Sequence, residues 1–350
     1  MRKNKRNYWL AFIFSLGVTM GLFNHLQAMA KTNDSQNNDI GFSVSARIPN
    51  DQINKKNTFF DLKMTKGKSQ TLKTVIYNTT NQDIKIQTAI HTAYTNSNGT
   101  IEYVTPSKSF DKSLKTRMSR ITKISGDKVV TVPANGSKTV SAQVEIPNKN
   151  FDGVILGGWY FKRVDQKVTG SVKKSMNVTN QYSYVIGLKY TMGKVPSPKL
   201  VLGNVKAGMS NYHRGIFPEL RNVTPVIVPN VTLHTTIKSK NSGKVVKDVT
   251  KKQVQMAPNS VFKYPILTGN KQLQAGNYHL HLVAKNDQHR WVFDKDFTIS
   301  NEDAQKFNSA SVDNSGISIW WLVGLGALGM LVLVGIIWLV IWYIKKRSKQ

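Results

Sequence analysis

Residues 84–103 read IKIQTAIHTAYTNSNGTIEY, and this stretch decides the fold class. Apolar, β-branched or aromatic side chains recur at every second position from Ile84 to Tyr94, with polar Lys85 and Gln87 between them. A period of two is typical of a β-strand that buries one face. Asn96–Gly99 then supplies turn residues before apolar residues resume, so the stretch predicts a β-hairpin.

Strands of the same pattern are predicted on both sides of this hairpin. The first block adds residues 72–77 and 140–146, and a second block that begins near Ser171 adds residues 182–190, 231–237, 278–284 and 291–299. No helical periodicity of useful length separates the strands. The pattern therefore predicts an all-β fold of two tandem immunoglobulin-like β-sandwich domains, either strung out or packed about a shared axis, with a β-barrel as the alternative.

The C-terminal segment Ile317–Ile344 contains no charged residue and is followed at once by a basic tail, residues 345–350. A helix of this length, at about 1.5 Å per residue, exceeds the hydrocarbon core of a bilayer, which is about 30 Å thick. Aromatic residues lie near both of its ends, where the headgroup layers would be. We predict one transmembrane helix with a cytoplasmic tail, because Lys and Arg residues that flank a membrane span are found mainly on its cytoplasmic side.

The N-terminus has the pattern of a secretory signal peptide. Arg2, Lys3, Lys5 and Arg6 precede an apolar run, and Ala28-Met29-Ala30 places small residues where a signal peptidase cleaves. We expect cleavage after Ala30, with an uncleaved second anchor as the alternative. The predicted organisation is a signal peptide over 1–30, a polar leader over 31–39, sandwiches over 40–165 and 171–300, a flexible stalk over 301–316, the helix over 317–344 and the tail over 345–350.

Composition restricts the chemistry and the partners. The chain has no cysteine, which excludes disulfides, thiol catalysis and zinc–thiolate sites. Its formal net charge is +30, and without the basic signal and tail 41 Lys and Arg still face 19 Asp and Glu. Such an extracellular surface attracts polyanions such as teichoic acid or anionic lipid, whereas nucleic acid is a poor match. Solvation in a charged wall explains the same excess equally well.

Catalytic and metal sites are not expected. His279 and His281 alternate along a predicted strand and could share a metal, but solvent-facing residues alternate in the same way. Asp294 and Asp296 flank Lys295 and are typical of a solvated face rather than of a glycosidase pair. We therefore predict a protein that is not an enzyme and has no metal or cofactor.

Two binding features are predicted. In the segment 151–161, Trp159 or Tyr160 could stack on a sugar, while inward-facing core positions with glycines for close sheet approach are the alternative. Both can hold for alternate residues. The Lys-rich strand Ile237–Lys240 is expected to guard a sheet edge against self-pairing while leaving it open to a partner strand.

Several short segments, in this order along the chain, resemble the WxL-interacting proteins of low-GC Gram-positive bacteria. They are residues 48–52 (IPNDQ), 95–103 (TNSNGTIEY), 151–158 (FDGVILGG), 180–186 (NQYSYVI), 257–260 (APNS) and 274–278 (QAGNY). The resemblance extends over nearly the whole chain, including the signal, both β blocks, the apolar helix and the basic tail.

The resemblance implies a peptidoglycan-binding domain followed by a domain that binds host ligands such as extracellular matrix, on a cell-membrane protein that acts beside WxL-domain surface proteins. It assigns no individual binding residue. Trp320-Trp321-Leu322 spells W-x-L but lies in the predicted spanning helix, so this chain is expected to be the partner and not the WxL protein. An accessory or sensor subunit of a cell-wall enzyme system is the alternative function.

Overall fold

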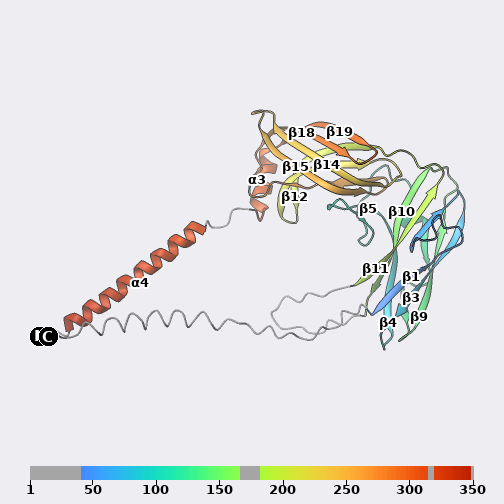
Figure 1. The fold of residues 1–350 in the computed structure, drawn as a ribbon, viewed down its shortest axis with the longest axis horizontal. Coiled ribbons are helices and arrows are strands. Elements are labelled where there is room, and N and C mark those ends of the chain that lie inside the picture. Colours follow the sequence, from blue (N-terminus) through green and yellow to red (C-terminus); the bar gives the residue numbers. More distant parts are fainter. Residues whose placement is uncertain (1–40, 166–181, 314–318, 348–350) are drawn as a thin grey trace. The chain divides into compact units, whose positions relative to one another are not determined.

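The computed structural model describes residues 41–165, 182–313 and 319–347. The predicted signal peptide, its cleavage site after Ala30 and the polar leader lie outside the described residues. Strands make up most of the described chain, and one long apolar helix follows them (Figure 1). The prediction of an all-β fold with one apolar C-terminal helix is confirmed.

The first sandwich pairs a four-stranded with a five-stranded sheet. The former has the order β1 (Phe42–Arg47), β3 (Ser69–Asn78), β9 (Ser137–Glu145) and β7 (Thr122–Ser125), and the latter the order β2 (Phe60–Lys63), β11 (Ser183–Met192), β10 (Gly153–Arg163), β4 (Ile84–Thr92) and β8 (Val129–Val132). Phe42 packs edge-on against Tyr184, and Thr122 shares a hydrogen bond of 3.1 Å with the Tyr190 hydroxyl. These contacts join the two sheets across one core.

The core of the first sandwich follows from the alternation seen in the sequence. Ile84 and Ile86 of β4 are fully buried, as is Ile76 of β3, whereas Lys85 between the first two is exposed. Burying such a side chain contributes about 1.5–3 kcal/mol, so a strand with a period of two is stable only with one face covered. The strand predicted from residue 84 is confirmed as β4.

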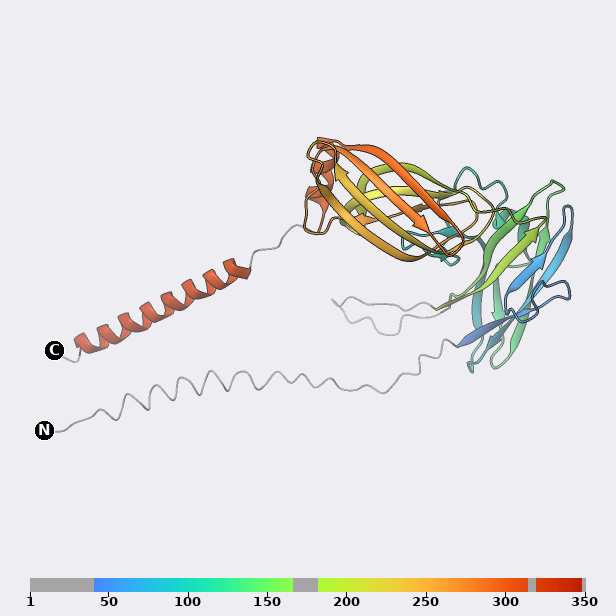
Figure 2. The ribbon, with the colours of Figure 1, turned by 45° about the horizontal axis from the view of Figure 1, so that its top comes forward.

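The second sandwich is built in the same way. One sheet has the order β12 (Leu200–Ser210), β13 (His213–Asn222) and β16 (Ser260–Lys263), with β17 (Ile266–Leu267) also paired to β13, and the other the order β15 (Val245–Met256), β14 (Val228–Ser239), β18 (Gly276–Lys285) and β19 (Arg290–Ile299). The four long strands of the second sheet lie side by side as one twisted layer (Figure 2). Side chains from both sheets form a single buried cluster that includes Leu220, Leu233 and Leu282.

Strand β11 lies in a different sheet from the one its position in the sequence suggests. It pairs with β10 from Gly153 opposite Met192 to Lys162 opposite Ser183, and it also runs parallel to β2. The pattern placed this strand in the second block, but it belongs structurally to the first sandwich. Local periodicity identifies a strand without identifying its partner, because the partner is set by long-range packing.

The predicted hairpin is present and projects from the first sandwich. β5 (Tyr94–Thr95) and β6 (Ile101–Glu102) form a two-stranded sheet around the turn. The Asn96 side-chain oxygen accepts hydrogen bonds from the backbone N–H groups of Asn98 and Thr100, at 3.0 and 3.2 Å. Gly99 has φ +76°, a left-handed conformation that favours glycine.

Residues 301–310, predicted as part of a flexible stalk, are instead the helix α3 (Asn301–Ala310). The Ser300 side chain caps the helix by accepting a hydrogen bond from the Asp303 N–H at 3.0 Å. Ala304 is buried, and Phe307 packs against the core of the second sandwich three residues later. The docking face needs only two residues at helical spacing, Ala304 and Phe307. Because the rest of the segment is polar, its composition did not reveal this short apolar stripe.

A second helix, α4 (Ile319–Arg347), follows at the C-terminus. Its stretch Val323–Arg347 is long and apolar enough to cross a membrane. The helix continues to Arg347, three residues beyond the predicted boundary at Ile344. One other short helix, α2 (Met118–Ile121), precedes β7 in the first sandwich.

Strand β14 is not a sheet edge. It is paired with β15 on one side and with β18 on the other, and Lys238 lies opposite both Val245 and His279. The prediction that Ile237–Lys240 guards an edge is therefore wrong. The edges of this sheet are β15 and β19, and β15 carries the exposed Lys252 and the half-buried Lys247 and Lys251.

Candidate functional site

The two predicted binding aromatics lie on opposite faces of β10. Trp159 is fully buried, its ring is stacked between those of Phe161 and Phe60, and its Nε1–H donates to Thr88 Oγ1. A ring enclosed in this way cannot stack on a sugar. For Trp159 the core interpretation of the sequence is the correct one, because the residue falls on the inward side of the strand.

Tyr160 lies half-buried on the outer face. Its ring stacks on the His91 imidazole with the centroids 5.1 Å apart, and His91 Nδ1 lies 3.0 Å from the Tyr103 carbonyl oxygen. Tyr103 packs over Gly158, and burial raises the pKa of Tyr103 to about 12. Sugar stacking on Tyr160 stays a prediction.

Further along the same outer face, β10 contacts the second sandwich. Val154 and Leu156 are buried in a small apolar cluster with Ala93 and with Ala257 of the second sandwich. The Val154 N–H donates to the Pro225 carbonyl oxygen at 2.7 Å. Gly153 makes this approach possible, because a Cβ there would lie 2.5 Å from the same oxygen.

The β5–β6 hairpin docks onto the second sandwich. The Gln255 N–H donates to the Gly99 carbonyl oxygen at 2.7 Å, and Thr95 Oγ1 lies 2.6 Å from Ser260 Oγ. A Cβ added to Gly99 would lie 3.2 Å from atoms of both Phe262 and Val254. A side chain at residue 99 would therefore crowd the packed tip of the hairpin, and its neighbours would have to move by a few tenths of an ångström.

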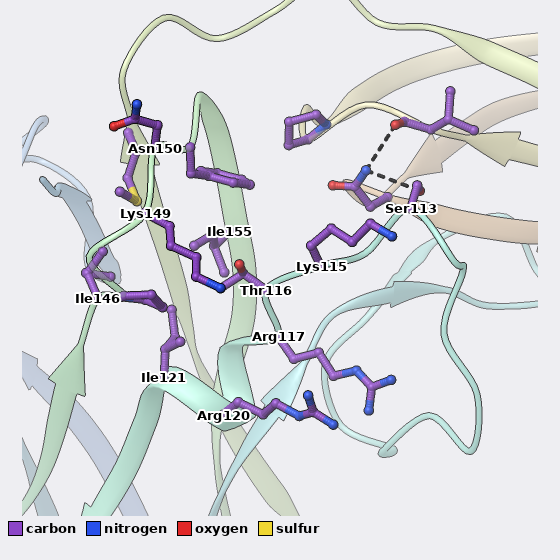
Figure 3. A pocket seen from close by; sticks show the side chains of 16 residues that line it. Ser113, Lys115, Thr116, Arg117, Arg120, Ile121, Ile146, Lys149, Asn150 and Ile155 are labelled. Carbon is purple, nitrogen blue, oxygen red and sulfur yellow. Dashed lines mark hydrogen bonds between the residues drawn. The ribbon is translucent and has the colours of Figure 1, made fainter. Parts of the chain in front are cut away.

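A cavity of about 540 Å³ lies beside these contacts and forms the junction pocket (Figure 3). Its lining residues are Ser113, Lys115, Thr116, Arg117, Arg120, Ile121, Ile146, Pro147, Lys149, Asn150, Phe151, Ile155, Met192, Val223, Pro225 and Asn259. Most belong to the first sandwich and the loops that join its strands, and the last three belong to the second. The volume is within the usual range for small-ligand pockets, roughly 300–1,000 Å³.

The lining of the junction pocket is charged with one sign only. It contains the four cations Lys115, Arg117, Arg120 and Lys149 and no Asp or Glu. Across residues 41–165, 182–313 and 319–347, none of the four forms an ion pair with a carboxylate. Lys149 points from the β9–β10 loop toward Thr116, across the space between the two segments (Figure 3). Together they create a positive potential in the pocket.

Local packing holds two of these cations, Arg117 and Arg120, in position. Met118 of α2 is buried against Gly157, where a Cβ would come within 2.4 Å of the Met118 side chain, so the glycine lets the helical turn lie close to β10. Arg117 and Arg120 therefore lie before and after the buried Met118, which fixes the position of this helical turn. The Arg117 guanidinium also lies 4.5 Å from the centre of the Phe110 ring, a cation–π contact that orients it.

The side of the pocket next to the second sandwich is fixed by polar contacts. The Asn259 side-chain amide donates to Ser113 Oγ at 3.2 Å and to the Val223 carbonyl oxygen at 3.1 Å (Figure 3). Two residues from Ser113, Asp111 accepts hydrogen bonds from Arg221. Burial opposes ionisation of Asp111, but the hydrogen bonds from Arg221 and Ser113 outweigh it and lower its pKa to about 2.

The imidazoles of His279 and His281 pair with carboxylates on the neighbouring strand. His279 Nδ1 lies 2.7 Å from Asp296 Oδ1, and His281 Nδ1 lies 2.8 Å from Asp294 Oδ1. All four side chains are on the outer face of the sheet. In the part of the chain that the structure describes, no group of three or more His, Cys, Asp or Glu side chains could hold a metal ion.

Sequence reasoning identified the aromatic residues but not the four cations of the junction pocket. They occur in loops and in one helical turn at 115, 117, 120 and 149, with no periodic pattern to mark them. In a chain with 49 Lys and Arg, single basic residues carry little information. Only the approach of the β9–β10 loop, α2 and the second sandwich brings these charges together.

Comparisons with solved structures find fimbrial chaperones at low similarity. A chain of a chaperone–tip adhesin complex of CFA/I fimbriae biogenesis is 10% identical, with 73% of this chain and 98% of that chain covered and a TM-score of 0.31. The YadV chaperone is 13% identical, with 74% and 99% covered and a TM-score of 0.26. The E. coli chaperone DraB is 14% identical, with 68% and 94% covered and a TM-score of 0.25. No curated protein matches the sequence.

Two family models match the chain in sequence. The peptidoglycan-binding domain of WxL-interacting proteins matches residues 42–163, and the host-binding domain of the same proteins matches residues 173–309. Both are described as binding domains, and their order is the one that the sequence resemblance implies. Together they span most of the chain, which therefore belongs to the WxL-interacting protein family.

Proposed function

We propose that this protein is a membrane-anchored, non-enzymatic surface protein that holds WxL-domain proteins at the cell wall. The first sandwich attaches to peptidoglycan, the second contacts host ligands, and α4 fixes both to the membrane. The observation that carries the proposal is the ordered pair of family matches, a peptidoglycan-binding domain followed by a host-binding domain, on one chain that ends in an apolar helix.

The surface of α4 supports the anchoring role. Large apolar side chains are exposed along the helix, including Trp321 at 70% and Leu331 at 71% of their full accessibility. An apolar surface of this extent is unfavourable in water and is satisfied in lipid. At the C-terminal end Lys346 Nζ lies 5.2 Å from the centre of the Trp342 ring, an arrangement suited to the headgroup layer.

A partner segment binds at the sheet edge formed by β15. β15 is an edge strand, so its outer N–H and C=O groups can pair with an extended segment of a WxL-domain protein. Its Lys247, Lys251 and Lys252 favour an acidic partner segment. Hydrogen exchange on the complex should show new protection along β15, and protection confined to loops would contradict this mode.

The wall-binding role is tested with the full chain in mild detergent and insoluble, purified peptidoglycan. Co-sedimentation of the chain with the polymer is expected, and its absence would refute the wall attachment. The anchoring role is tested separately with protease added to wall-stripped cells. Both sandwiches should be degraded while a small C-terminal piece survives, and an epitope after Gln350 that is accessible from outside would contradict the orientation.

A further inference from the structure

We propose that the junction pocket binds a carboxylate-bearing peptide, and that in the wall this ligand is the stem peptide of peptidoglycan. The proposal rests on the proposed function, because it names the part of the polymer that the first sandwich contacts. It is carried by three features of the pocket: unpaired cations of one sign, an apolar floor, and walls from both sandwiches.

The cations select an anion. Lys115, Arg120 and Lys149 are exposed and Arg117 is half-buried, so all four keep a charged head that is accessible from the pocket. With no Asp or Glu in the lining, an entering carboxylate displaces no internal partner. A guanidinium offers paired N–H donors that match the two oxygens of a carboxylate, and such charge-assisted hydrogen bonds are about twice as strong as neutral ones.

The floor selects against a purely polar polyanion. Ile121, Ile146, Ile155 and Met192 are buried side chains whose surfaces form the base of the pocket, and Phe151 is half-buried beside them. A polyol-phosphate chain carries the anion but little apolar surface to cover this floor. A short peptide with methyl or methylene side chains supplies both, and each buried methylene contributes about 0.8 kcal/mol.

The pocket is also poorly matched to a bare sugar. Sugar sites present aromatic faces to the ring and acceptors to its hydroxyl groups, whereas this lining has Phe151 as its one aromatic residue and no carboxylate. The enclosed and fully buried Trp159 is not available as a platform. The pocket therefore recognises the peptide part of the wall polymer, and the glycan strand lies outside it.

The ligand touches both sandwiches. Val223, Pro225 and Asn259 complete the wall opposite the cations, and Asn259 is already bonded to Ser113 of the first sandwich. A ligand that contacts both sides favours the state in which the two are docked. Wall attachment thus strengthens the contact between the peptidoglycan-binding and the host-binding parts of the chain.

The inference is tested by calorimetry on the full chain in mild detergent with three probes. The probes are a disaccharide–tetrapeptide from digested peptidoglycan, the same disaccharide after an amidase has removed the peptide, and a glycerol-phosphate oligomer. We expect the disaccharide–tetrapeptide to bind. The disaccharide without the peptide should bind at least about tenfold more weakly, because it lacks one or two charge-assisted hydrogen bonds. Equal binding of the two saccharides would overturn the proposal, and tighter binding of the oligomer would assign the pocket to a phosphate polymer instead.

The variants separate the pocket from general charge. Lys115→Gln combined with Arg120→Gln should weaken binding of the disaccharide–tetrapeptide about tenfold or more. Lys73→Gln combined with Lys138→Gln removes the same charge from exposed positions of β3 and β9 and should leave it unchanged. Lys149→Gln alone, at an exposed position of the β9–β10 loop, gives the same test if the double variant is unstable. Equal losses in the pocket and control variants would overturn the assignment.

Failure of this inference is distinguishable from failure of the proposed function. If the unmodified chain co-sediments with intact peptidoglycan and the pocket variant does so equally well, the pocket assignment is wrong and wall attachment stands. If the unmodified chain does not co-sediment at all, the wall-binding function itself is wrong.

Discussion

Arg221 of the second sandwich forms a two-point ion pair with Asp111 of the first, with Nε 2.6 Å from Oδ2 and Nη2 2.9 Å from Oδ1. The Asp111 side chain is only 5% exposed. This pair, the hairpin contact at Gly99 and the hydrogen bonds of Asn259 fasten the two sandwiches beside the junction pocket.

Removing the charge of Asp111 should loosen this junction. Asp111→Asn is expected to lower the free energy of unfolding by about 2 kcal/mol at neutral pH, since the native pKa of about 2 lies below the ordinary 3.8. A depressed native pKa stabilises above the unfolded value, so the contribution should be lost as pH falls from about 4 to about 2. Denaturant unfolding at several pH values measures this.

The matched control is Asp287→Asn, at an exposed turn position. It should change the free energy of unfolding by less than about 0.5 kcal/mol. The free energy of unfolding of the unmodified chain should fall between pH 4 and 2. If it falls by the same amount in Asp111→Asn, a group other than Asp111 is responsible.

Gly99→Ala should destabilise the docked hairpin by two separate effects. A non-glycine residue at φ +76° costs about 1–2 kcal/mol, and the new Cβ would crowd Phe262 and Val254 at 3.2 Å. Gly243→Ala has nearly the same backbone, φ +68°, with no neighbouring atom within 4 Å. The loss of stability in Gly243→Ala therefore measures the backbone effect alone. Thermal unfolding should show a larger loss in Gly99→Ala, and the difference is due to the crowding. Equal losses of stability in the two variants would mean that the tip is not packed against the second sandwich.

Trp159 and Tyr160 should respond differently to truncation. Trp159→Ala removes a fully buried ring and is expected to lower the free energy of unfolding by about 3–5 kcal/mol. Tyr160→Ala should cost much less, because the ring is half-buried on the outer face. If Tyr160 stacks on a sugar, this variant should also reduce co-sedimentation with peptidoglycan; unchanged co-sedimentation would remove the residue from the binding surface.

His279 should titrate above its ordinary range. Hydrogen bonds to Asp296 and then to Asp294 raise the pKa of His279. A raised native pKa stabilises fully below the unfolded value near 6.5 and loses this contribution as pH rises through the native value. The site is exposed, so the effect on stability should be below about 1 kcal/mol. NMR titration should show a lower pKa for His279 in Asp296→Asn and no change in Asp287→Asn.

The segment 301–310 should be ordered in solution. Ser300→Ala removes the side-chain cap from the Asp303 N–H and should weaken α3 locally by about 1 kcal/mol. Hydrogen exchange of the α3 amides should accelerate in this variant, while amides of β18 keep their protection. Rapid exchange of α3 in the unmodified chain would instead favour the flexible stalk predicted from composition.

The sequence alone was sufficient for everything that depends on local pattern or on bulk composition. The alternation around Ile84 determined β4, the Asn96–Gly99 turn determined the hairpin, and the charge-free run after Ile317 determined the apolar helix. These features are decided by side-chain period, by turn chemistry and by length, all of which are properties of neighbouring residues. Family membership also followed from short segments in a fixed order.

Only the tertiary structure decided which segments meet. β11 joins the first sandwich although its position in the sequence placed it in the second block. β14 is central although its lysines suggested an edge, and Trp159 faces inward while Tyr160 faces outward. The junction pocket likewise depends on the approach of three separate segments, because cations spread from Lys115 to Lys149 acquire a common field only when packing brings them together. Such contacts arise from long-range burial, which no local window of the sequence contains.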